Sequence, residues 1–311
     1  MTEFHHVSVL LDECIEGLNI KPDGIYVDGT LGGAGHSSQI AKRLTTGRLI
    51  GIDRDPVALK AAGERLAPWA DRVTLVHSNF CEIKQVLEDL GIDGVDGILL
   101  DLGVSSPQLD DGSRGFSYMA DAPLDMRMNS EDVMSAYDVV NTWSQEELKR
   151  ILYDYGEERY APRIASAICN RRAEKPIETT LELVDVIRGA MPAAALREKQ
   201  HPAKRSFQAI RIAVNDELGS VEKVMKDAIP ALNPGGRLAI ITFHSLEDRI
   251  VKNAMAEAAK GCTCPPSFPV CVCGKKPQVK LVSRKPIVSG EEELERNPRA
   301  RSAKLRVCEK K

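Results

Sequence analysis

The sequence predicts an α/β protein whose sheet is doubly wound and mostly parallel, interrupted by an inserted helical segment. Three observations lead to this prediction. Short apolar runs rich in β-branched residues alternate with stretches long enough for crossover helices. A glycine-rich turn follows the first of these runs. The alternation stops near residue 106 and resumes near residue 215. A chain of 311 residues with 43% hydrophobic content is long and apolar enough for this arrangement.

The expected strands and helices follow along the chain. The strand-like runs have apolar centres, which indicates strands covered on both faces. The expected strands are 24–30, 48–53, 72–80, 95–103, 237–243, 278–284 and 302–308. The expected helices around them are 35–45, 56–67, 81–90 and 216–231. Asp55 with Pro56 favours a capped helix start, and NPGG at 233–236 predicts a turn.

The interruption is expected to be mainly helical. It opens with a long polar loop, SSPQLDDGSRGFSYMADAPLDMRM, and contains no strand-like run. Ser144 with Glu147, and Thr179 with Glu182, have the spacing of capping boxes. The expected boundaries are 1–105 for the first part of the main domain, 106–214 for the insertion, and 215–311 for the second part with a basic C-terminal tail.

Composition limits the class of protein. No run of about 18 apolar residues is present, and the N-terminus lacks a signal-peptide pattern, so a cytoplasmic protein without membrane contact is expected. The net charge is −3, but residues 275–311 hold 12 basic against 5 acidic residues. This stretch indicates an anionic partner, and a solvated surface tail explains it equally well. The sequence does not define an oligomeric state.

Four of the eight cysteines lie in CTCPPSFPVCVC, at 262, 264, 271 and 273. This is not the spread framework of a small secreted domain, so reduced thiols are expected. The pattern C-x-C-x6-C-x-C could hold Zn²⁺ as a structural clip, although pairs one residue apart are less usual than C-x2-C. Reduced free thiols and a zinc clip are both retained as interpretations. No residue is predicted to bind a catalytic metal ion.

The glycine-rich turn YVDGTLGGAGHS predicts a ligand site at the start of the first crossover. Residues without a Cβ let a ligand approach the backbone near a helix N-terminus. Asp53 ends the second strand, where ribose hydroxyls of a nucleotide cofactor need an acceptor. The spacing departs from G-x-G-x-x-G, because Ser38 stands where the third glycine belongs, and this disfavours a nicotinamide oxidoreductase. An acidic residue before a looser glycine loop, here Asp28, resembles instead the first motif of S-adenosylmethionine-dependent methyltransferases, whose cofactor has a cationic amino group that a carboxylate suits. Phe80 and Asp101 then follow the third and fourth strands.

The turn after the fourth strand predicts the methyl acceptor. Ser105, Ser106, Pro107 and Gln108 are related to the D/N/S-P-P-aromatic turn of amino-group methyltransferases without copying it. An exocyclic base nitrogen is a poor nucleophile until acceptors hold its hydrogens, and serine oxygens with a proline-fixed carbonyl provide such acceptors. Methylation at cytosine C5 would require a cysteine nucleophile, and no Pro-Cys turn stands here. An ordinary turn remains the alternative.

Motifs along nearly the whole chain resemble the MraW (RsmH) family of small-subunit rRNA cytosine-N4 methyltransferases. They include HHVSVLLDE (5–13), DGTLGGAGHS (28–37), GIDRDP (51–56), DGILLDLGVSSPQLDDGSRGFSY (96–118), PLDMRM (123–128), YGEERYA (155–161), RSFQAIRIAVNDEL (205–218), FHSLEDRIVK (243–252) and NPRARSAKLRV (297–307). The resemblance implies a class I (Rossmann-like) methyltransferase fold and methylation of one cytidine N4 in the decoding centre of 16S rRNA, within the small ribosomal subunit.

The resemblance also implies site residues. S-adenosyl-L-methionine contacts are expected at Ala34, Gly35, His36, Asp53, Phe80, Asp101 and Gln108. The chemistry of the turn, and not the resemblance, predicts Asp101, Ser105, Ser106 and Pro107 at the reacting amine. The alternative function is an RNA-binding assembly factor that keeps the cofactor pocket without turnover.

Two further stretches are weighed. In HPAKRSFQAIR, the cations Lys204, Arg205 and Arg211 beside Phe207 suit phosphate contact and base stacking, and a solvated helix face is the other interpretation. His244 follows the fifth strand and is a candidate for lining the acceptor pocket. A general base is not required, because the amine loses its proton after it becomes cationic.

Overall fold

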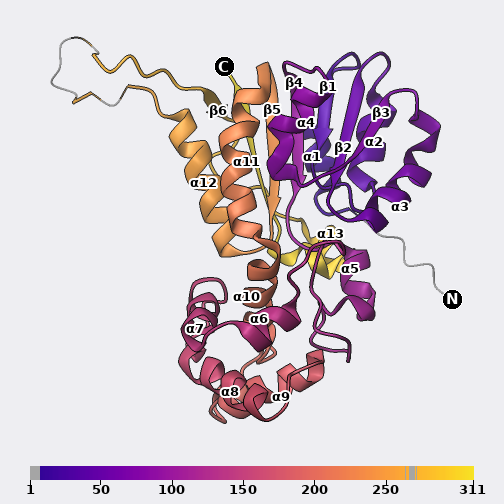
Figure 1. Cartoon of the computed structure of the whole chain (residues 1–311). Coiled ribbons are helices and arrows are strands. Elements are labelled where there is room, and N and C mark those ends of the chain that lie inside the picture. The colour runs from indigo at the N-terminus through magenta and orange to yellow at the C-terminus, as the bar shows by residue number, and fades with distance from the viewer. Residues whose placement is uncertain (1–7, 263, 266–269, 271) are drawn as a thin grey trace. The chain divides into compact units, whose positions relative to one another are not determined.

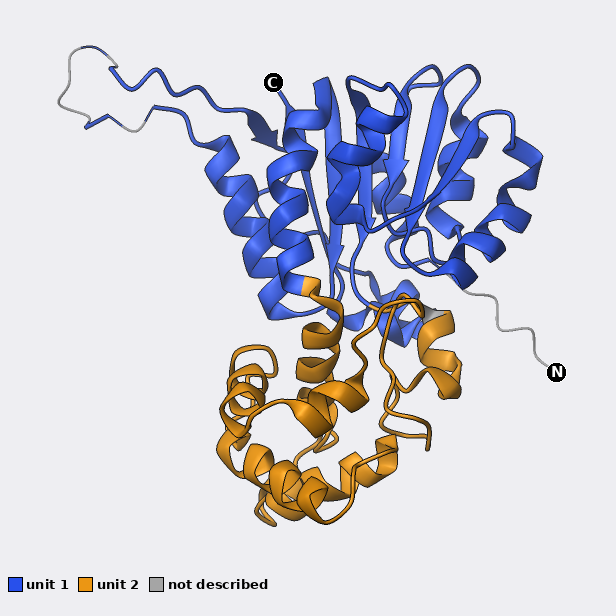
Figure 2. Ribbon diagram, viewed as in Figure 1, with its two compact units in different colours: residues 1–103, 218–311 blue, residues 104–217 orange. Residues whose placement is uncertain are grey.

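The computed structural model describes residues 8–262, 264–265, 270 and 272–311. The chain divides into two compact units, residues 1–103 with 218–311 and residues 104–217, which Figure 2 colours blue and orange. Among the described residues, no helix is both long and apolar enough to span a bilayer.

Unit 1 is built on a seven-stranded sheet within the described residues, in the order β3-β2-β1-β4-β5-β7-β6 (Figure 1). The strands are β1 (Ile25–Asp28), β2 (Arg48–Asp53), β3 (Val73–His77), β4 (Val95–Asp101), β5 (Leu232–Thr242), β6 (Val279–Leu281) and β7 (Lys304–Lys310). Only β7 runs against its neighbours in this set, since β5 and β6 both pair with it in antiparallel register. The predicted class I fold with a doubly wound, mostly parallel sheet is confirmed.

Helices cover both faces of this sheet. The helices of unit 1 are α1 (Leu11–Leu18), α2 (Gly35–Arg43), α3 (Pro56–Leu66), α4 (Ile83–Asp89), α11 (Glu217–Ala231), α12 (Ser245–Ala259) and α13 (Glu291–Arg296). One apolar cluster joins the strands to α4, α11 and α12. A second cluster joins them to α1, α2 and α3. Because both faces are buried, the inner residues of β2 are all buried, as its continuous apolar run predicts.

Local signals in the sequence explain several boundaries. The Asp55 side chain accepts a hydrogen bond from the Val57 N–H at 3.0 Å, with Pro56 in the first helical position, so the predicted cap of α3 is confirmed. The predicted turn at 233–236 lies inside β5. Leu232 pairs with Val95 and Arg237 with Gly97, so these four residues form a bulge opposite one residue of β4.

The basic C-terminal stretch is folded and is not a tail. Its β7 forms six register pairs with β5, and β6 extends the sheet beyond it. Several of its cations also have carboxylate partners: Arg306 lies 2.7 Å from Asp248, and Lys280 lies 3.1 Å from Glu309. Part of the positive charge counted in the sequence is therefore paired with carboxylates of the protein itself.

Unit 2 is helical, and its core is one apolar cluster. Its helices are α5 (Ser106–Asp110), α6 (Ala136–Thr142), α7 (Gln145–Asp154), α8 (Ala161–Glu174), α9 (Thr180–Ala190) and α10 (Lys204–Asn215). The predicted capping boxes at the starts of α7 and α9 are both present. The stretch predicted as a loop after residue 104 contains the short helix α5, because Ser105 caps it and Pro107 suits its first turn.

Candidate active site

Unit 1 brings the glycine loop and two strand-end carboxylates to one edge of the sheet. In the strand order, β1 lies between β2 and β4, and all three are parallel. Asp53 is the last residue of β2, Asp101 is the last residue of β4, and residues 29–34 follow β1. The connection order of the sheet reverses at β1, and ligands of open α/β sheets bind beside such a reversal. The predicted positions in unit 1 therefore meet where this fold class places its ligand.

The glycine loop is fixed between its two neighbouring strands. The Gly29 N–H donates to the Leu99 carbonyl on β4 at 2.9 Å, and the Leu31 N–H donates to the Ile52 carbonyl on β2 at 3.2 Å. A Cβ added to Gly29 would lie 2.5 Å from Leu100 Cδ2, so only glycine fits this close approach. The loop leaves β1 in one defined direction.

Asp53 holds the loop with its carboxylate. Its Oδ2 accepts a hydrogen bond from the Gly32 N–H at 2.8 Å, and its Oδ1 accepts from the Asp55 N–H at 2.9 Å. Burial raises the pKa of Asp53 to about 6, against the lowering effect of these two hydrogen bonds. Each carboxylate oxygen has a second lone pair, so Asp53 can also accept hydrogen bonds from a ligand hydroxyl.

The loop carries two residues in the left-handed region. The φ of Gly32 is 47°, and the φ of Ala34 is 55°. Ala34 is fully buried and directly precedes α2, so a non-glycine residue is held in a strained conformation at the predicted cofactor loop. Arg65 of α3 donates to the Gly33 carbonyl at 2.8 Å. A Cβ on Gly35 would come within 1.8 Å of Ser8 Oγ, which explains glycine there.

Asp28, the acidic residue before the loop, is used inside the fold. It is 1% exposed. Its Oδ1 accepts from the Thr30 N–H at 3.1 Å, and its Oδ2 accepts from the Ser37 hydroxyl at 2.6 Å. Burial raises the pKa of Asp28. The sequence argument assigned this carboxylate to a cofactor's cationic amino group, whereas the structure gives it the task of shaping the loop.

His36 lies in the first turn of α2 and is 6% exposed. Its Nε2 lies 3.0 Å from the Val9 carbonyl oxygen, so Nε2 carries the proton and donates. Its Nδ1 lies 3.9 Å from Asp101 Oδ2. The imidazole therefore faces the end of β4, beside the carboxylate predicted to act at the amine.

Asp101 combines partial exposure with one buried oxygen that lacks a hydrogen-bond partner. Its side chain is 26% exposed, its Oδ1 is the buried atom, and its N–H donates to Thr30 Oγ1 at 2.6 Å. Burial, followed by the charges of Asp28 and Glu247, raises the pKa of Asp101 to about 8. An unsatisfied buried acceptor is costly and indicates a group reserved for a ligand.

Phe80 follows β3 and is half-buried against the apolar cluster of α4, α11 and α12. A Cβ added to Gly29 would lie 3.0 Å from the Cβ of Phe80, so the backbone of Phe80 lies next to the start of the loop. Asn79 caps the 3₁₀ turn that begins at Phe80 by accepting from the Cys81 N–H at 3.1 Å. The structure thus places Phe80 with the loop.

The remaining predicted residues belong to unit 2 and form the start of α5. Ser105 Oγ accepts from the Gln108 N–H at 3.4 Å, and Gln108 Oε1 accepts from the Ser105 N–H at 3.0 Å. Gln108 is buried and Pro107 is exposed. The side chain of Ser106 lies outside the described part of the structure. The SSPQ turn is therefore a capping box that fixes its own backbone.

The interpretation of Phe207 as a base-stacking residue is wrong. Phe207 is 3% exposed in the core of unit 2, with its ring edge-on to Tyr118 at 5.7 Å. Arg211 is also committed, since its guanidinium donates to both carboxylate oxygens of Glu217 at 2.8 and 2.9 Å. Apolar spacing along α10 outweighs the local mixture of cation and aromatic. Lys204 remains exposed on this helix.

His244 has a structural position as the residue that caps α12. Its Nδ1 accepts from the Glu247 N–H at 3.5 Å, and its Nε2 lies 3.0 Å from Glu247 Oε1. The other carboxylate oxygen of Glu247 accepts from the Phe243 N–H at 3.0 Å. Capping-box spacing, with histidine in place of serine, is the signal that identifies this pair in the sequence.

Sequence reasoning missed several residues that support the site. They are Thr30, Ser37, Arg65 and Glu247, which hold Asp101, Asp28, Gly33 and the backbone after β5. Ser37 lies within the glycine motif, so its proximity to Asp28 was available as a signal. Arg65 contacts the loop from another helix, and nothing in the sequence indicates that contact.

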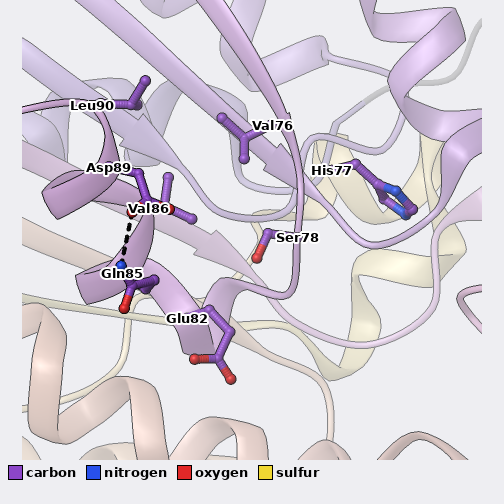
Figure 3. A pocket seen from close by; sticks show the side chains of 8 residues that line it. All are labelled: Val76, His77, Ser78, Glu82, Gln85, Val86, Asp89 and Leu90. Atoms are coloured by element: carbon purple, nitrogen blue, oxygen red, sulfur yellow. Dashed lines mark hydrogen bonds between the residues drawn. The ribbon is translucent and has the colours of Figure 1, made fainter.

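A cavity lies elsewhere in unit 1, between the end of β3 and α4, and Figure 3 shows the side chains that line it. Its volume is about 280 Å³. Its lining residues are Val76, His77, Ser78, Glu82, Gln85, Val86, Asp89 and Leu90. Gln85 donates to Asp89 across one side at 2.8 Å. None of the predicted site residues lines it, so this cavity is separate from the loop and strand ends described above.

This chain is similar to known proteins in three comparisons. The model of the MraW methylase family matches residues 3–311. A protein of Brevibacillus brevis named ribosomal RNA small subunit methyltransferase H is 62% identical over 308 residues, which cover 99% of this chain and 98% of that protein. Its namesake from Clostridioides difficile is 60% identical over 309 residues, 99% of each chain. A solved rRNA methylase from Streptococcus thermophilus aligns with 96% of this chain and 92% of its own, at 11% identity and a TM-score of 0.41.

Proposed function

The chain belongs to the MraW methylase family, and from that premise we propose that it methylates the N4 amino group of one cytidine in the decoding centre of 16S rRNA, with S-adenosyl-L-methionine as methyl donor. The names of the curated relatives support action on small-subunit rRNA. The amino-group turn SSPQ and the lack of a Pro-Cys turn support nitrogen as the acceptor atom.

The residues at the sheet edge fit the methyl donor. Asp53 has free lone pairs for ribose hydroxyls, and the backbone of Ala34 and Gly35 opens α2 beside it. Phe80 offers an apolar wall for the adenine, and Asp101 has a buried oxygen without a partner. When bound, the donor supplies an electrophilic methyl group on a positively charged sulfur.

The chain's own contribution to transfer is to prepare the amine. The N4 lone pair of cytosine is delocalised into the ring, which makes the nitrogen a poor nucleophile. Acceptors that bind the two amino hydrogens can orient the amino group so that its lone pair points at the methyl group. We assign this role to Asp101 together with the Ser105, Ser106 and Pro107 turn. Only three residues separate Asp101 from that turn in the sequence. An ionised Asp101 accepts a hydrogen bond from the amine, and the proton leaves once the nitrogen has become cationic.

The helical unit and exposed cations are the proposed RNA contacts. Lys204 on α10, with Arg284 and Lys285 after β6, presents positive charge to solvent. Phosphate contacts of this kind supply most of the sequence-independent affinity for RNA. The target base leaves its stack to reach the site, and the assembled small subunit presents it.

The observation that carries this proposal is the meeting of the glycine loop, Asp53 and Asp101 at the reversal of the sheet. The test is incubation with labelled S-adenosylmethionine and unmodified small subunits, followed by nucleoside analysis. Label in N4-methylcytidine is the expected result. Binding of the donor without any transfer would instead identify a non-catalytic assembly factor.

A further inference from the structure

The segment that joins α12 to β6 carries a cysteine cluster that the proposed methyl transfer does not use. It spans residues 260–278, and its described residues extend away from the body of unit 1, as Figure 1 shows. We call this segment the excursion. Its described residues form no helix or strand before Val279. Val270 and Val272 are 70% and 74% exposed, so apolar burial does not hold this segment. A long connection without its own core needs another source of order.

The base of the excursion is closed by two contacts. The Gln278 N–H donates to the Ala258 carbonyl at 2.8 Å, and Lys275 Nζ lies 2.6 Å from Glu257 Oε1. These contacts bring the outgoing and returning ends of the segment together. Cys262 and Cys273 stand on opposite sides of the excursion, close to this base in sequence.

Three sulfurs converge above the closed base. The Sγ atoms of Cys262, Cys264 and Cys273 all lie within 4.8 Å of one another. The sulfurs of Cys262 and Cys273 are 3.7 Å apart. A disulfide bond requires about 2.05 Å, so this separation is not that of a covalent pair. Two thiolates bound to one tetrahedral zinc ion at about 2.3 Å lie about 3.8 Å apart, which matches the observed separation.

A backbone donor and three lysines accompany the sulfurs. The Cys264 N–H points at Cys262 Sγ at 3.4 Å, and an N–H donor stabilises a negatively charged sulfur. Lys260, Lys275 and Lys276 lie within three residues of the cysteines in sequence, and the first two pair with the Glu257 carboxylate, each at 2.6 Å. Cys262 and Cys273 are exposed, so a metal ion can reach them.

We propose that Cys262, Cys264 and Cys273 bind one Zn²⁺ ion, which clips the excursion between α12 and β6 into a fixed structure. Tetrahedral sulfur sites select zinc or iron, and zinc needs no redox partner to serve as a structural clip. Zinc prefers four ligands. The sequence supplies a further cysteine at 271, which lies outside the described residues.

Elemental analysis of the full-length protein tests the proposal, because metal content does not depend on methyl transfer. After purification without chelators or a histidine tag, we expect about one zinc ion per chain. In Cys262→Ser/Cys273→Ser the zinc content should fall at least about tenfold, because two ligands are lost. Cys169→Ser removes a thiol from α8, in unit 2, and should keep the zinc of the parent protein.

Cobalt substitution gives a second measurement on the unaltered chain. Co²⁺ bound by thiolates produces sulfur-to-metal charge-transfer absorption, which should be present in the parent protein and absent in the double variant. Several results would overturn the proposal: iron in place of zinc, a Cys262–Cys273 disulfide in mass spectra of alkylated protein, or zinc that persists in the double variant. Absence of zinc after incubation with the metal alone would overturn it as well.

Discussion

The carboxylate of Asp53 accepts a hydrogen bond from the Gly32 N–H at 2.8 Å and thereby ties the end of β2 to the loop after β1. The proposed cofactor needs this carboxylate as an acceptor for its ribose hydroxyls. Asp53→Asn keeps the size of the side chain but replaces one acceptor oxygen with a donor, which also removes one of the two hydrogen bonds from the Gly32 and Asp55 N–H groups. We expect a loss of about tenfold to a hundredfold in affinity for S-adenosylmethionine, measured by calorimetry, because hydrogen bonds to charged groups contribute about 1.5–3 kcal/mol. Asp71→Asn, on the surface beside Arg72, is the matched control and should bind as the parent does.

The raised pKa of Asp53 adds a pH dependence to the same measurement. Hydroxyl donors favour the ionised carboxylate, so cofactor binding lowers the pKa of Asp53 below its value of about 6 in the free protein. By linkage, affinity stays level above pH 6 and falls as the pH drops below it. Asp53→Asn should remove this fall. An equally steep decline in the variant would show that another group titrates.

Asp101 predicts the pH dependence of transfer itself. Its pKa of about 8 means that much of the carboxyl is protonated at neutral pH, and a protonated carboxyl is a poor acceptor for the amine hydrogen. We expect kcat/KM for small subunits to rise as the pH increases through about 8, and Asp101→Asn to be slower with a flat profile. A variant that keeps both the rate and the rise would remove Asp101 from the reaction.

The same residue predicts a cost to stability. The pKa of Asp101 is raised in the folded chain from its ordinary value of 3.8, so the folded state holds a proton that the unfolded state releases. The linked stabilisation is fully present below pH 3.8 and is lost as the pH rises through about 8. Asp101→Asn cannot ionise. Its Tm should therefore exceed that of the parent by more at alkaline than at acid pH, as followed by circular dichroism. A pH-independent difference would contradict this account.

The glycine loop predicts a pair of opposite effects from one kind of substitution. In Gly29→Ala the new Cβ would lie 2.5 Å from Leu100 Cδ2 and 3.0 Å from Phe80 Cβ. We expect a loss of about 1–3 kcal/mol in the free energy of unfolding, together with weaker cofactor binding, because the loop must move. Gly189→Ala in α9 meets nothing within 4 Å and should stabilise by about 0.5–1 kcal/mol. Urea titrations compare the two variants.

The parts of the fold that could be predicted depend on local patterns. The buried run of β2 and the caps of α3, α7 and α9 are determined by residues close together in the sequence, and each prediction is confirmed. The turn expected at 233–236 became a bulge in β5, because pairing with β4 continues on both sides of it. Sheet pairing between distant segments is the information that a local pattern lacks.

The site shows the same limit at the level of side chains. The sequence identifies Asp53 and Asp101 because both end strands of a parallel sheet. It misassigns Asp28, whose oxygens turn inward to Thr30 and Ser37. It also misassigns Phe207, because the neighbouring cations suggested an RNA contact, whereas the apolar spacing along α10 buries this ring in the core of unit 2. In both cases the residue type suggested a ligand contact, but the side chain is buried in the structure.

The exposed cations after β6 predict the salt dependence of RNA binding. Arg284 and Lys285 are exposed, whereas Arg306 and Lys304 of β7 lie 2.7 and 3.5 Å from Asp248. If the exposed pair contacts phosphates, Arg284→Ala/Lys285→Ala should weaken binding to small-subunit RNA and reduce the slope of log K against log salt by about 1.4–1.8.

Lys42→Ala/Lys60→Ala provides the control, because it removes the same charge from exposed positions on α2 and α3. It should change the net charge of the protein by the same amount as the first variant but leave the slope close to that of the parent protein. The reason is that contacts with phosphate, and not net charge, set the number of counterions released. Filter binding over a range of salt concentrations separates the two variants. Equal slopes in both would mean that long-range charge alone attracts the RNA, and the phosphate contacts would then have to be sought on the helical unit, beginning with Lys204.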